Sequence, residues 1–556
     1  MKQQIYQQIL DAVKALDIEV SEQDLRKIQV EYPESSLGDY SSNVALILSK
    51  KVGMKPQELA GKIKEKISDT TKFEKIEVAG PGFLNFTLDP IAIIEKMIAI
   101  TSDEKKEGEK ILLEYFQPNI AKPLHIGHMR TAVIGDAIKR MLKYTGANVE
   151  SDTHMGDWGT QFGFLILGVK QHGSVPAEAD LNRIYVELNA KAENDLSVRE
   201  TAKAEFVKLE QGDAENRKIW KELVAQSVQK FMDFAEEIEL LPFENHWPES
   251  FYEDKMPAVL ESLKEKQLIK ESQGAQIVDL EEKGLGVAII IKSDGGSTYL
   301  LRDLATFIFA KNQGYKKHLY VVDSRQSLHY KQLFEILKMM GEMEEGEGVH
   351  IDYGFMSFKG EALSTRKGNM VLADEVLAQA KEKAGKIIAE KNPDLKEKEA
   401  VVDAIGKGAI KYFDLSHNRH SDIEFDWEQA LDFEGNSGPY LQYTHARLAS
   451  IIRKHSPEPF KFSMDVEKTD TEKKLLFTLS IFDEKVQAAL ENYLPNVFAN
   501  YLYELATITN RFYHENPVLK EEDENKKQFR LYLVETSQLT LAKGLGLLGI
   551  KAPDEM

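Results

Sequence analysis

Two histidines, His125 and His128, stand three residues apart in the segment PNIAKPLHIGHMR at 118–130. At a loop-to-helix junction this spacing lets both imidazoles project to one side, where backbone N–H groups point outward and can bind a phosphate. Such donors suit the stabilisation of charge on an α-phosphate while pyrophosphate is displaced. Gly127 between them would let a flat base approach the backbone. Because a bare His-x-Gly-His is more often an ordinary polar helix start, the interpretation depends on the flanking elements.

The flanking sequence predicts a strand, a loop and a helix in that order. ILLEYF at 111–116 is a β-type run, and NVESDTHMGDWG at 148–159 supplies a further strand and a glycine-rich loop. Between them, apolar residues with helical spacing share one face before Gly146, namely Ala132, Val133, Ala137, Ile138, Met141 and Leu142. This order is typical of a βαβ nucleotide-binding half.

The chain of 556 residues is long enough for several domains. We expect a multidomain α/β protein in three parts: a small N-terminal α+β domain at 1–104, a Rossmann-like parallel-sheet catalytic domain at 105–375, and a C-terminal α-helical bundle at 376–556. The catalytic part should carry a helical insertion at about 164–247. SDEKKEGEK at 102–110 has the composition of a connector.

Later segments extend this scheme. VAIIIK, HLYVVDS and VHIDYGFMSF are strand candidates that should continue the α/β sheet. In the first domain, IEVAGPGFLNFTL predicts two short strands around a Gly-Pro-Gly turn, and from about Asp374 onward the apolar periodicity is helical.

Composition excludes several classes of function. The chain has no cysteine, which excludes disulfides, thiolate catalysis and Cys-ligated zinc and favours a reducing cytoplasm. No apolar stretch approaches the roughly 18 to 20 residues that span a bilayer, and the start has no signal-peptide pattern. The net charge of −20 opposes indiscriminate nucleic-acid binding, although a local basic groove can still bind a polyanion.

Seven segments in order resemble one family, the arginyl-tRNA synthetases of class I: PNIAKPLHIGHMR, THMGDWGTQFG, YLLRDLA, DSRQSLH, LSTRKGN, DFEGNSGPYLQYTHAR and LLGIKAPDEM. The resemblance implies that ATP and L-arginine form arginyl-adenylate and pyrophosphate, and that arginine is then transferred to the 3′ end of tRNA(Arg). It also implies tRNA-dependent activation, Mg²⁺ bound with ATP and a monomeric enzyme. We expect no dedicated metal cage.

A selective site for arginine needs carboxylates and neutral acceptors, because a guanidinium carries five N–H donors and a permanent charge. The resemblance assigns the guanidinium to acidic and polar residues, namely Glu114, Asp303, Tyr299 and Gln326. It assigns the α-amino group to Asn119 and the carboxylate to His125. As alternatives, Asp303 could form a surface pair with Arg302, and Tyr299 could be core packing. Phe116-Gln117 departs from the family's small residues.

The second signature loop corresponds to ALSTRKG at 362–368, where Ala362 and Thr365 occupy the places of lysines. A mobile cation for the triphosphate is therefore missing, and the resemblance assigns Lys122, upstream of His125, to that task. The residues expected to bind ATP are His125, Gly127, His128, Lys122, Ser364, Thr365 and Arg366. The alternative for Arg366 and Lys367 is a solvated basic loop.

The resemblance also points to tRNA contacts in two places. Phe83 and Asn85 of GPGFLNF are candidates for the outer corner of the tRNA. Candidates in the bundle, half of which we expect only to pack helices, are Tyr440, Gln442, Tyr443, His445 and Arg447. The THMGDWG loop, with His154, Asp157 and Trp158, should help form the site, and Trp158 is equally expected as a buried brace.

Two other functions compete with arginine ligation. A synthetase-like tRNA-binding protein without catalytic activity is motivated by Ala362, Thr365 and Phe116, whereas the intact histidines and acidic residues oppose it. A small-molecule adenylyltransferase on the same fold would not need the C-terminal bundle.

Overall fold

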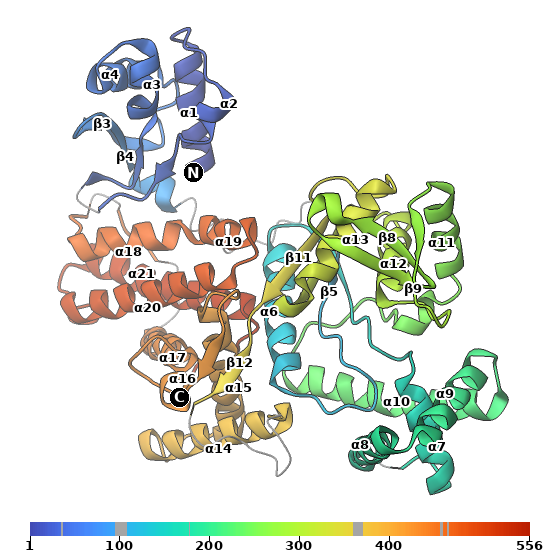
Figure 1. Ribbon diagram of the computed structural model, residues 1–556. Coiled ribbons are helices and arrows are strands. Elements are labelled where there is room, and N and C mark those ends of the chain that lie inside the picture. The colour runs from blue at the N-terminus through green and yellow to red at the C-terminus, as the bar shows by residue number, and fades with distance from the viewer. Residues whose placement is uncertain (35–36, 95–107, 177, 360–370, 456–459, 464–465) are drawn as a thin grey trace.

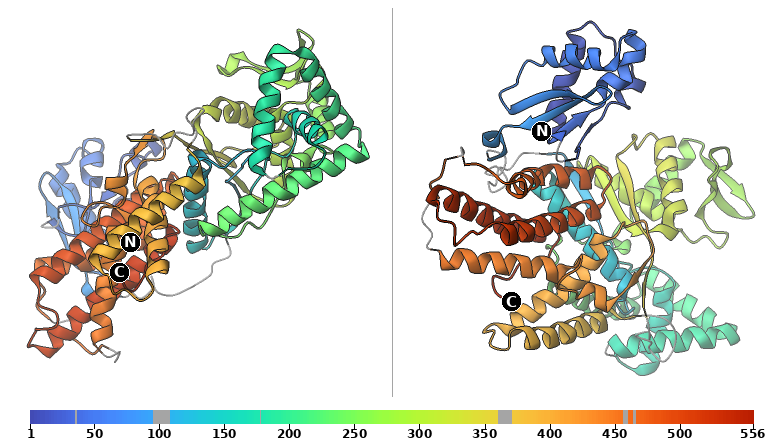
Figure 2. Two further views of the ribbon diagram at one scale, coloured as in Figure 1. Left: turned by 90° about the horizontal axis from the view of Figure 1, so that it is seen from below. Right: turned by 90° about the vertical axis from the view of Figure 1, so that its left-hand side faces the viewer.

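The computed structural model describes residues 1–34, 37–94, 108–176, 178–359, 371–455, 460–463 and 466–556. Figures 1 and 2 show an N-terminal lobe above a bundle of long helices, with an α/β lobe beside the bundle. Among the described residues, no helix combines the length and the apolar character needed to cross a membrane.

The N-terminal lobe is an antiparallel sheet covered by helices. Its strands, in the order β1-β2-β4-β3, are β1 (Val30–Glu31), β2 (Tyr40–Ser42), β4 (Phe83–Leu88) and β3 (Phe73–Ala79). The helices are α1 (Lys2–Lys14), α2 (Glu22–Leu25), α3 (Val44–Val52) and α4 (Pro56–Lys66). The two strands predicted around the Gly-Pro-Gly turn are thus confirmed as β3 and β4.

The α/β lobe contains a parallel sheet in the order β11-β10-β5-β6. Its strands are β5 (Lys110–Glu114), β6 (Asn148–Asp152), β10 (Lys317–Asp323) and β11 (Gly348–Tyr353). After β5 the chain passes to β6 on one side, whereas β10 and β11 lie on the other side. The order of the strands therefore reverses between β5 and β10, where doubly wound sheets bind ligands at the carboxyl ends of their strands.

Helix α6 (Ile126–Tyr144) follows β5 in the chain and packs directly against Tyr115, the residue that follows the last residue of β5. Gly135 permits this approach: a Cβ atom there would lie 2.3 Å from Cγ of the buried Tyr115. The small residue therefore fixes the distance between the helix and the carboxyl end of β5.

Replacing Gly135 by alanine is expected to lower the free energy of unfolding by about 1–3 kcal/mol, because the added methyl overpacks a full interior. The measurement is the denaturant midpoint of unfolding. Gly546→Ala is the matched control, since its Cβ would meet nothing within 4 Å, and it should be neutral or stabilising by up to about 1 kcal/mol. Equal midpoints for the two variants would contradict this account of α6.

Two insertions interrupt the parallel sheet. The first is helical, as predicted, and contains α7 (Gln161–His172), α8 (Glu178–Asn194), α9 (Leu196–Glu210) and α10 (Ala214–Glu237). The second was not predicted. It contains η2 (Glu249–Tyr252), α11 (Met256–Glu265), β7 (Ile269–Ser272), β8 (Ala275–Leu280), η3 (Glu281–Lys283) and β9 (Gly286–Ile291).

The expectation that VAIIIK continues the parallel sheet is wrong. This segment forms β9 in the separate antiparallel sheet β7-β8-β9. Val287 and Ile289 are 44% and 47% exposed, while Ala288 and Ile290 are buried. One face of β9 is therefore solvated, as antiparallel strands allow, although the apolar run resembled a strand buried on both faces.

The chain then returns to the parallel sheet and enters the bundle. Helices α12 (Tyr299–Asn312) and α13 (Ser327–Met339), with the short η4 (Ser324–Gln326), flank β10 in sequence. The bundle contains α14 (Ala373–Lys391), α15 (Lys398–Ser416), α16 (Trp427–Ala430), α17 (Gly438–Lys454), α18 (Asp470–Ser480), α19 (Phe482–Glu491), α20 (Pro495–Glu515) and α21 (Glu524–Leu547). The helical C-terminal third is confirmed, with a short strand β13 (Ile423–Phe425) added, which pairs with β12 (Met356–Phe358).

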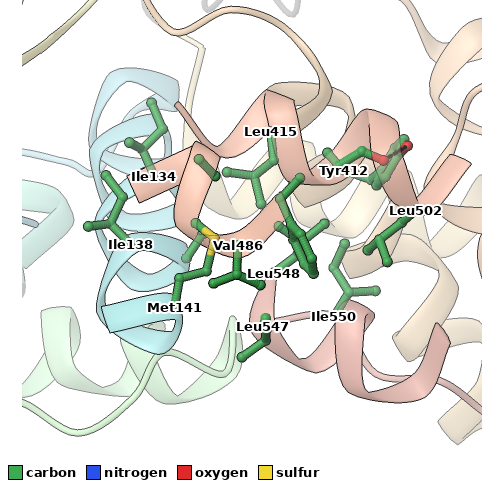
Figure 3. Close-up of a cluster of buried hydrophobic side chains, with 14 of the residues drawn as sticks. Ile134, Ile138, Met141, Tyr412, Leu415, Val486, Leu502, Leu547, Leu548 and Ile550 are labelled. Atoms are coloured by element: carbon green, nitrogen blue, oxygen red, sulfur yellow. Dashed lines mark hydrogen bonds between the residues drawn. The ribbon is translucent and has the colours of Figure 1, made fainter. Parts of the chain in front are cut away.

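Helix α6 joins the sheet to the bundle through a shared core. Ile134, Ile138 and Met141 of α6 belong to one cluster of buried side chains with Val486 and Leu548 of the bundle (Figure 3). The sheet and the bundle are thus not separated by a flexible linker at this helix.

A buried arginine on α6 reinforces this connection. Arg130 has no solvent exposure, and its Nε lies 3.1 Å from Oδ1 of Asp414 on α15. Its guanidinium also donates to the carbonyl oxygens of Gly354, Phe355 and Ser421, on the two segments that carry β12 and β13. The Arg130 side chain therefore connects α6 both to helix α15 of the bundle and to the segments that carry β12 and β13.

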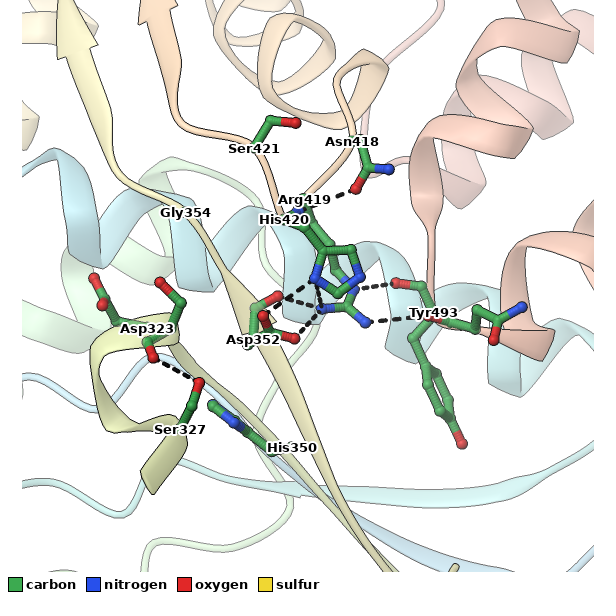
Figure 4. Close-up of polar contacts among 12 residues, drawn as sticks. Asp323, Ser327, His350, Asp352, Gly354, Asn418, Arg419, His420, Ser421 and Tyr493 are labelled. Carbon is green, nitrogen blue, oxygen red and sulfur yellow. Dashed lines mark hydrogen bonds and ion pairs between the residues drawn. The ribbon is translucent and has the colours of Figure 1, made fainter. Parts of the chain in front are cut away.

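A second arginine lies at the same junction. Arg419 donates from Nη1 to Oδ1 of Asp352 at 2.8 Å, at the end of β11, and from Nε to the carbonyl oxygen of Tyr493 at 2.9 Å (Figure 4). His420 Nδ1 lies 3.1 Å from the other oxygen of Asp352. The carboxyl end of the sheet is thus fixed to the bundle by paired charges.

Candidate active site

His125 and His128 begin α6, and backbone hydrogen bonds fix the positions of their protons. His125 Nδ1 accepts from the N–H of Gly127 at 3.1 Å, and His128 Nδ1 accepts from the N–H of His125 at 3.2 Å. The ring centroids are 3.9 Å apart. Since each Nδ1 is an acceptor, each neutral ring carries its proton on Nε2. Gly127 is required, because a Cβ there would lie 2.9 Å from the ring of His125.

Both histidines are neutral at physiological pH. Burial lowers the pKa of His125, and the charges of Arg325 and Lys122 lower it further. Burial and the neighbouring His125 lower the pKa of His128 to about 3. The positive potential at this helix start therefore comes from two Nε2–H donors, backbone N–H groups and nearby cations, and not from imidazolium ions.

In the described part of the chain, Lys122 and Arg325 are the cations that act on these histidines. Lys122, the predicted one, is half-buried in the loop before α6 and acts on the pKa of both rings. Sequence reasoning missed Arg325, which is held by two contacts to Asp323, Nε to Oδ1 at 2.8 Å and Nη2 to Oδ2 at 2.9 Å. Its position just after β10, the neighbour of β5, was the available signal. The predicted ATP-binding residues Ser364, Thr365 and Arg366 lie outside the described residues, as do Ala362 and Lys367.

Glu114, at the carboxyl end of β5, belongs to a cluster of side chains that we call the acidic pocket, namely Glu114, Asp152, His154 and Asp303. Glu114 is 2% exposed, and its Oε1 lies 2.6 Å from Nε2 of His318 on β10. Burial lowers the pKa of His318 to about 3, so this neutral imidazole donates to the carboxylate while its Nδ1 accepts from Tyr320. Gln117 Nε2 donates to Oε2 at 3.3 Å. Burial, opposed by His154, raises the pKa of Glu114 to about 7.

Asp303 on α12 faces the same pocket. Its Oδ2 lies 2.5 Å from Nε2 of His329, and its Oδ1 lies 3.9 Å from Nε2 of His154. Burial would lower the pKa of His329, yet the hydrogen bond and charge of Asp303 raise it. Arg302 forms ion pairs with Glu249 and with a second glutamate, Glu253, rather than with Asp303. The alternative of an Arg302–Asp303 surface pair is therefore wrong.

Three other predicted residues, Tyr299, Gln326 and Asn119, are partly or largely accessible. Tyr299 is 62% exposed at the start of α12, and Gln326 is exposed in η4, so neither packs in the core. Asn119 forms a parallel bridge with Gly156, whose backbone comes so close that a Cβ would lie 2.2 Å from Oδ1 of Asn119. The glycine of the THMGDWG loop therefore gives the asparagine its place beside the strand ends.

The unusual Phe116 does not enter the pocket. Its ring is fully buried and stacks with Phe234 of the helical insertion and with Phe243, both with centroids 6.3 Å away. Its backbone φ of 57° turns the chain immediately after β5. The departure from small residues thus changes the packing behind the site.

The THMGDWG loop is mostly a brace. Asp157 is 1% exposed and accepts from both the N–H and the hydroxyl of Ser250. Trp158 packs edge-on against Phe206 and Trp220 of the insertion, which supports the bracing interpretation. His154 alone turns toward the acidic pocket, with a positive φ of 39°.

The predicted tRNA-binding residues divide by exposure. Arg447 and Tyr443 are exposed and Phe83 is half-buried on β4, whereas Tyr440 is partly buried and its hydroxyl accepts from Asn510. Three candidates are buried, and each forms at least one hydrogen bond within the chain. These are Asn85, bonded to Ser41; Gln442, bonded to the carbonyls of Ala404 and Lys551; and His445, bonded to Pro553 and Gln538.

One further group was missed. Glu114, Asp152 and His154 each offer a ligand atom within 4.8 Å of the others, a spacing that suits a cation. With Asp303 they make this end of the sheet negative, while the start of α6 is positive. The arrangement can bind a cationic side chain and a polyphosphate side by side.

Comparisons with known proteins agree along the chain. Residues 92–427 match the model of the class I tRNA synthetase (R) catalytic domain, residues 441–556 the DALR anticodon-binding domain, and residues 3–88 the arginyl-tRNA synthetase N-terminal domain. Arginine–tRNA ligase of Fusobacterium nucleatum is 38% identical over 538 residues, with 94% of each chain covered. That of Ligilactobacillus salivarius is 38% identical over 559 residues, with 98% of each covered. The arginyl-tRNA synthetase of Thermus thermophilus superposes with a TM-score of 0.85 at 25% identity, covering 100% of both chains.

Proposed function

Because the chain belongs to the arginyl-tRNA synthetases and is an arginine–tRNA ligase, we propose that the acidic pocket at Glu114 and Asp303 holds the arginine side chain while His125, His128 and Lys122 bind ATP. The observation that carries this assignment is the juxtaposition of a negative and a positive site at the carboxyl ends of β5 and β10.

The reaction then follows from this arrangement. A carboxylate oxygen of arginine attacks the α-phosphorus of ATP, the bond to pyrophosphate breaks, and arginyl-adenylate forms. The Nε2–H groups of the two histidines donate to phosphate oxygens whose charge rises in the transition state. Lys122 balances charge on the departing pyrophosphate, and Asn119 receives the α-amino group. A terminal ribose hydroxyl of tRNA(Arg) next attacks the arginyl carbonyl, and AMP leaves.

The remaining assignments are part of this proposal. ATP enters as its Mg²⁺ complex, because a hard cation neutralises phosphate oxygens. Gly127 with Ser364, Thr365 and Arg366 lines the nucleotide, Tyr299 and Gln326 close the mouth of the amino-acid pocket, and Phe83, Tyr440 and Arg447 are the tRNA contacts. Residues 1–104, 105–375 and 376–556 act as tRNA-contacting, catalytic and anticodon-binding parts of a cytoplasmic monomer.

A pyrophosphate-exchange panel tests the proposed function. Exchange should require both arginine and tRNA(Arg), and lysine, citrulline and glutamine should not support it. Exchange driven equally by another amino acid would overturn the arginine pocket, and no exchange under any condition would favour the inactive tRNA-binding alternative. The test also separates an adenylyltransferase, which would show activity independent of tRNA.

Lys122→Ala is expected to slow exchange by about 10- to 100-fold, since it removes one charge-assisted contact to the triphosphate. The KM for ATP and the exchange rate are the measurements, and Lys122→Arg should recover part of the loss. Unchanged exchange in Lys122→Ala would show that another cation, such as Arg325, performs this task.

The affinity for arginine should depend on pH. Glu114 has a pKa of about 7 in the free enzyme because of burial, opposed by His154 and assisted by Asp303. Asp152 and the neutral His318 also face it. Because a guanidinium favours the ionised carboxylate, its binding releases a proton below pH 7, and the KM for arginine should rise by up to about tenfold per unit as pH falls from 7 to 5. Glu114→Gln should flatten this profile; an unchanged profile would assign the titration to another group.

A further inference from the structure

Asp152 ends β6, the strand beside β5, and the register of the two parallel strands places it directly opposite Glu114. Its side chain is completely buried, and its carboxylate lies within 4.8 Å of the nearest ligand atoms of Glu114 and His154. The neighbouring strands β5 and β6 thus end in two adjacent carboxylates, Glu114 and Asp152.

One oxygen of this carboxylate has no partner. Oδ1 accepts from the backbone N–H of Trp247 at 2.8 Å, whereas Oδ2 forms no hydrogen bond in the part of the chain that the structure describes. Nδ1 of His154 lies 4.0 Å from this oxygen and is also unpaired. A buried carboxylate oxygen without a donor is costly, so this atom marks where a ligand with a donor group fits.

Three other carboxylate oxygens of this cluster are already engaged, whereas Oδ1 of Asp303, which belongs to a partly exposed side chain, lies 3.9 Å from Nε2 of His154. Both oxygens of Glu114 accept protein hydrogen bonds, from His318 and Gln117, and Oδ2 of Asp303 contacts His329. A guanidinium, with five N–H donors in a fixed fork, needs several acceptors converging on it. Among the described residues of this cluster, Oδ2 of Asp152 is therefore the fully buried carboxylate oxygen that remains open.

We propose that Asp152 is a third carboxylate of the arginine pocket and that its Oδ2 accepts an N–H of the substrate guanidinium. This inference rests on the proposed function, because it places the guanidinium beside Glu114 and Asp303. Asp152 is then a specificity-determining residue that favours a cationic side chain over a neutral one of the same shape.

Electrostatics supports a cation at this point. Burial and the charge of Glu114 raise the pKa of Asp152 well above its ordinary value, although the backbone N–H groups of Trp247, Thr153 and His154 act to lower it. Burial raises the pKa of Glu114 to about 7. Two buried carboxylates side by side are unfavourable until a positive charge lies between them. A guanidinium supplies both the charge and the missing donor, whereas a divalent ion would need oxygen ligands or water beyond the three side chains of this group.

The test uses the full-length protein and compares arginine with citrulline, whose ureido group is neutral but similar in shape. Asp152→Asn keeps the size of the side chain and the acceptor for Trp247. We expect it to raise the dissociation constant for arginine by about 10- to 100-fold, measured by calorimetry with tRNA present. Citrulline binding and the KM for ATP should change by less than about threefold, so the preference for arginine over citrulline narrows.

Two variants make the result interpretable. Glu150→Gln is the matched control, because Glu150 lies two residues earlier on the same strand and is already paired with Lys110. The Glu150→Gln variant should bind arginine with normal affinity. Asp152→Ser, which retains an acceptor without charge, provides a second measurement if Asp152→Asn does not fold.

The outcomes distinguish this inference from the proposed function. Normal arginine affinity in Asp152→Asn together with a loss in Glu114→Gln would overturn the role of Asp152 and leave the pocket intact. Normal affinity in both would overturn the pocket itself. Equal weakening of arginine and citrulline, or a raised KM for ATP, would show a structural role. Stoichiometric metal in the purified protein that is lost in Asp152→Asn would show a metal site instead.

Discussion

His128→Ala should lower the rate of arginyl-adenylate formation by about 10²–10³-fold, the loss typical of removing one preorganised donor to a developing oxyanion. His128 Nδ1 is occupied by the backbone N–H of His125, so its Nε2–H is free to donate, and its pKa of about 3 keeps it neutral. The donor is therefore already oriented before ATP arrives. The measurement is the tRNA-dependent exchange rate at saturating substrates, with the KM for arginine expected to stay near normal.

Two controls sharpen this prediction. His128→Asn retains a donor and should recover part of the rate, whereas His172→Ala, at an exposed helix end, should change nothing. A loss smaller than about fivefold in His128→Ala would remove this histidine from phosphate stabilisation.

Glu114→Gln should reduce kcat/KM for arginine by about 10²–10³-fold, because it leaves the guanidinium facing a neutral amide in a buried site. Most of the change should lie in KM for arginine, since the contact exists before and during reaction, and the KM for ATP should be unaffected. Steady-state aminoacylation provides the measurement. An equal loss with respect to ATP would indicate general damage to the sheet edge.

The same substitution makes a prediction about stability. The folded-state pKa of Glu114 lies above the ordinary value of 4.5, so the folded state binds the proton more tightly than the unfolded state does. The stability from this group is therefore present at low pH and is lost as pH rises toward 7. Glu114→Gln should not lower the denaturation midpoint at pH 8, which separates its catalytic effect from unfolding.

Much of the fold was predictable because periodicity reports which faces are buried. The helix after His125, its stop near Gly146 and the bundle helices all followed from apolar spacing. The run VAIIIK failed because hydropathy alone does not distinguish a strand buried on both faces from one that exposes Val287 and Ile289.

Some residues of the candidate site were likewise predictable from the sequence, and others were not. His125, His128 and Glu114 lie at helix and strand ends, as expected: the spacing of the histidines predicted a helix start, and the family resemblance assigned Glu114. His318 and Asp152 were missed because they lie within ordinary strand sequence and acquire their setting only through pairing with β5. The burial of Gln442 and His445 could not be assigned residue by residue from the sequence, because a polar residue on an amphipathic helix gives no sign that it will contact a neighbouring carbonyl.

Arg130 has a mechanical consequence for the enzyme. Helix α6 is roughly 28 Å long at 1.5 Å per residue, its first turn carries the two histidines, and Arg130 just beyond them is bonded to the bundle and to the β12 segment. If the bundle rotates relative to the parallel sheet, either these hydrogen bonds break or α6 rotates with the bundle as one unit. A rotation of the bundle that kept these bonds would therefore also change the direction in which His125 and His128 point.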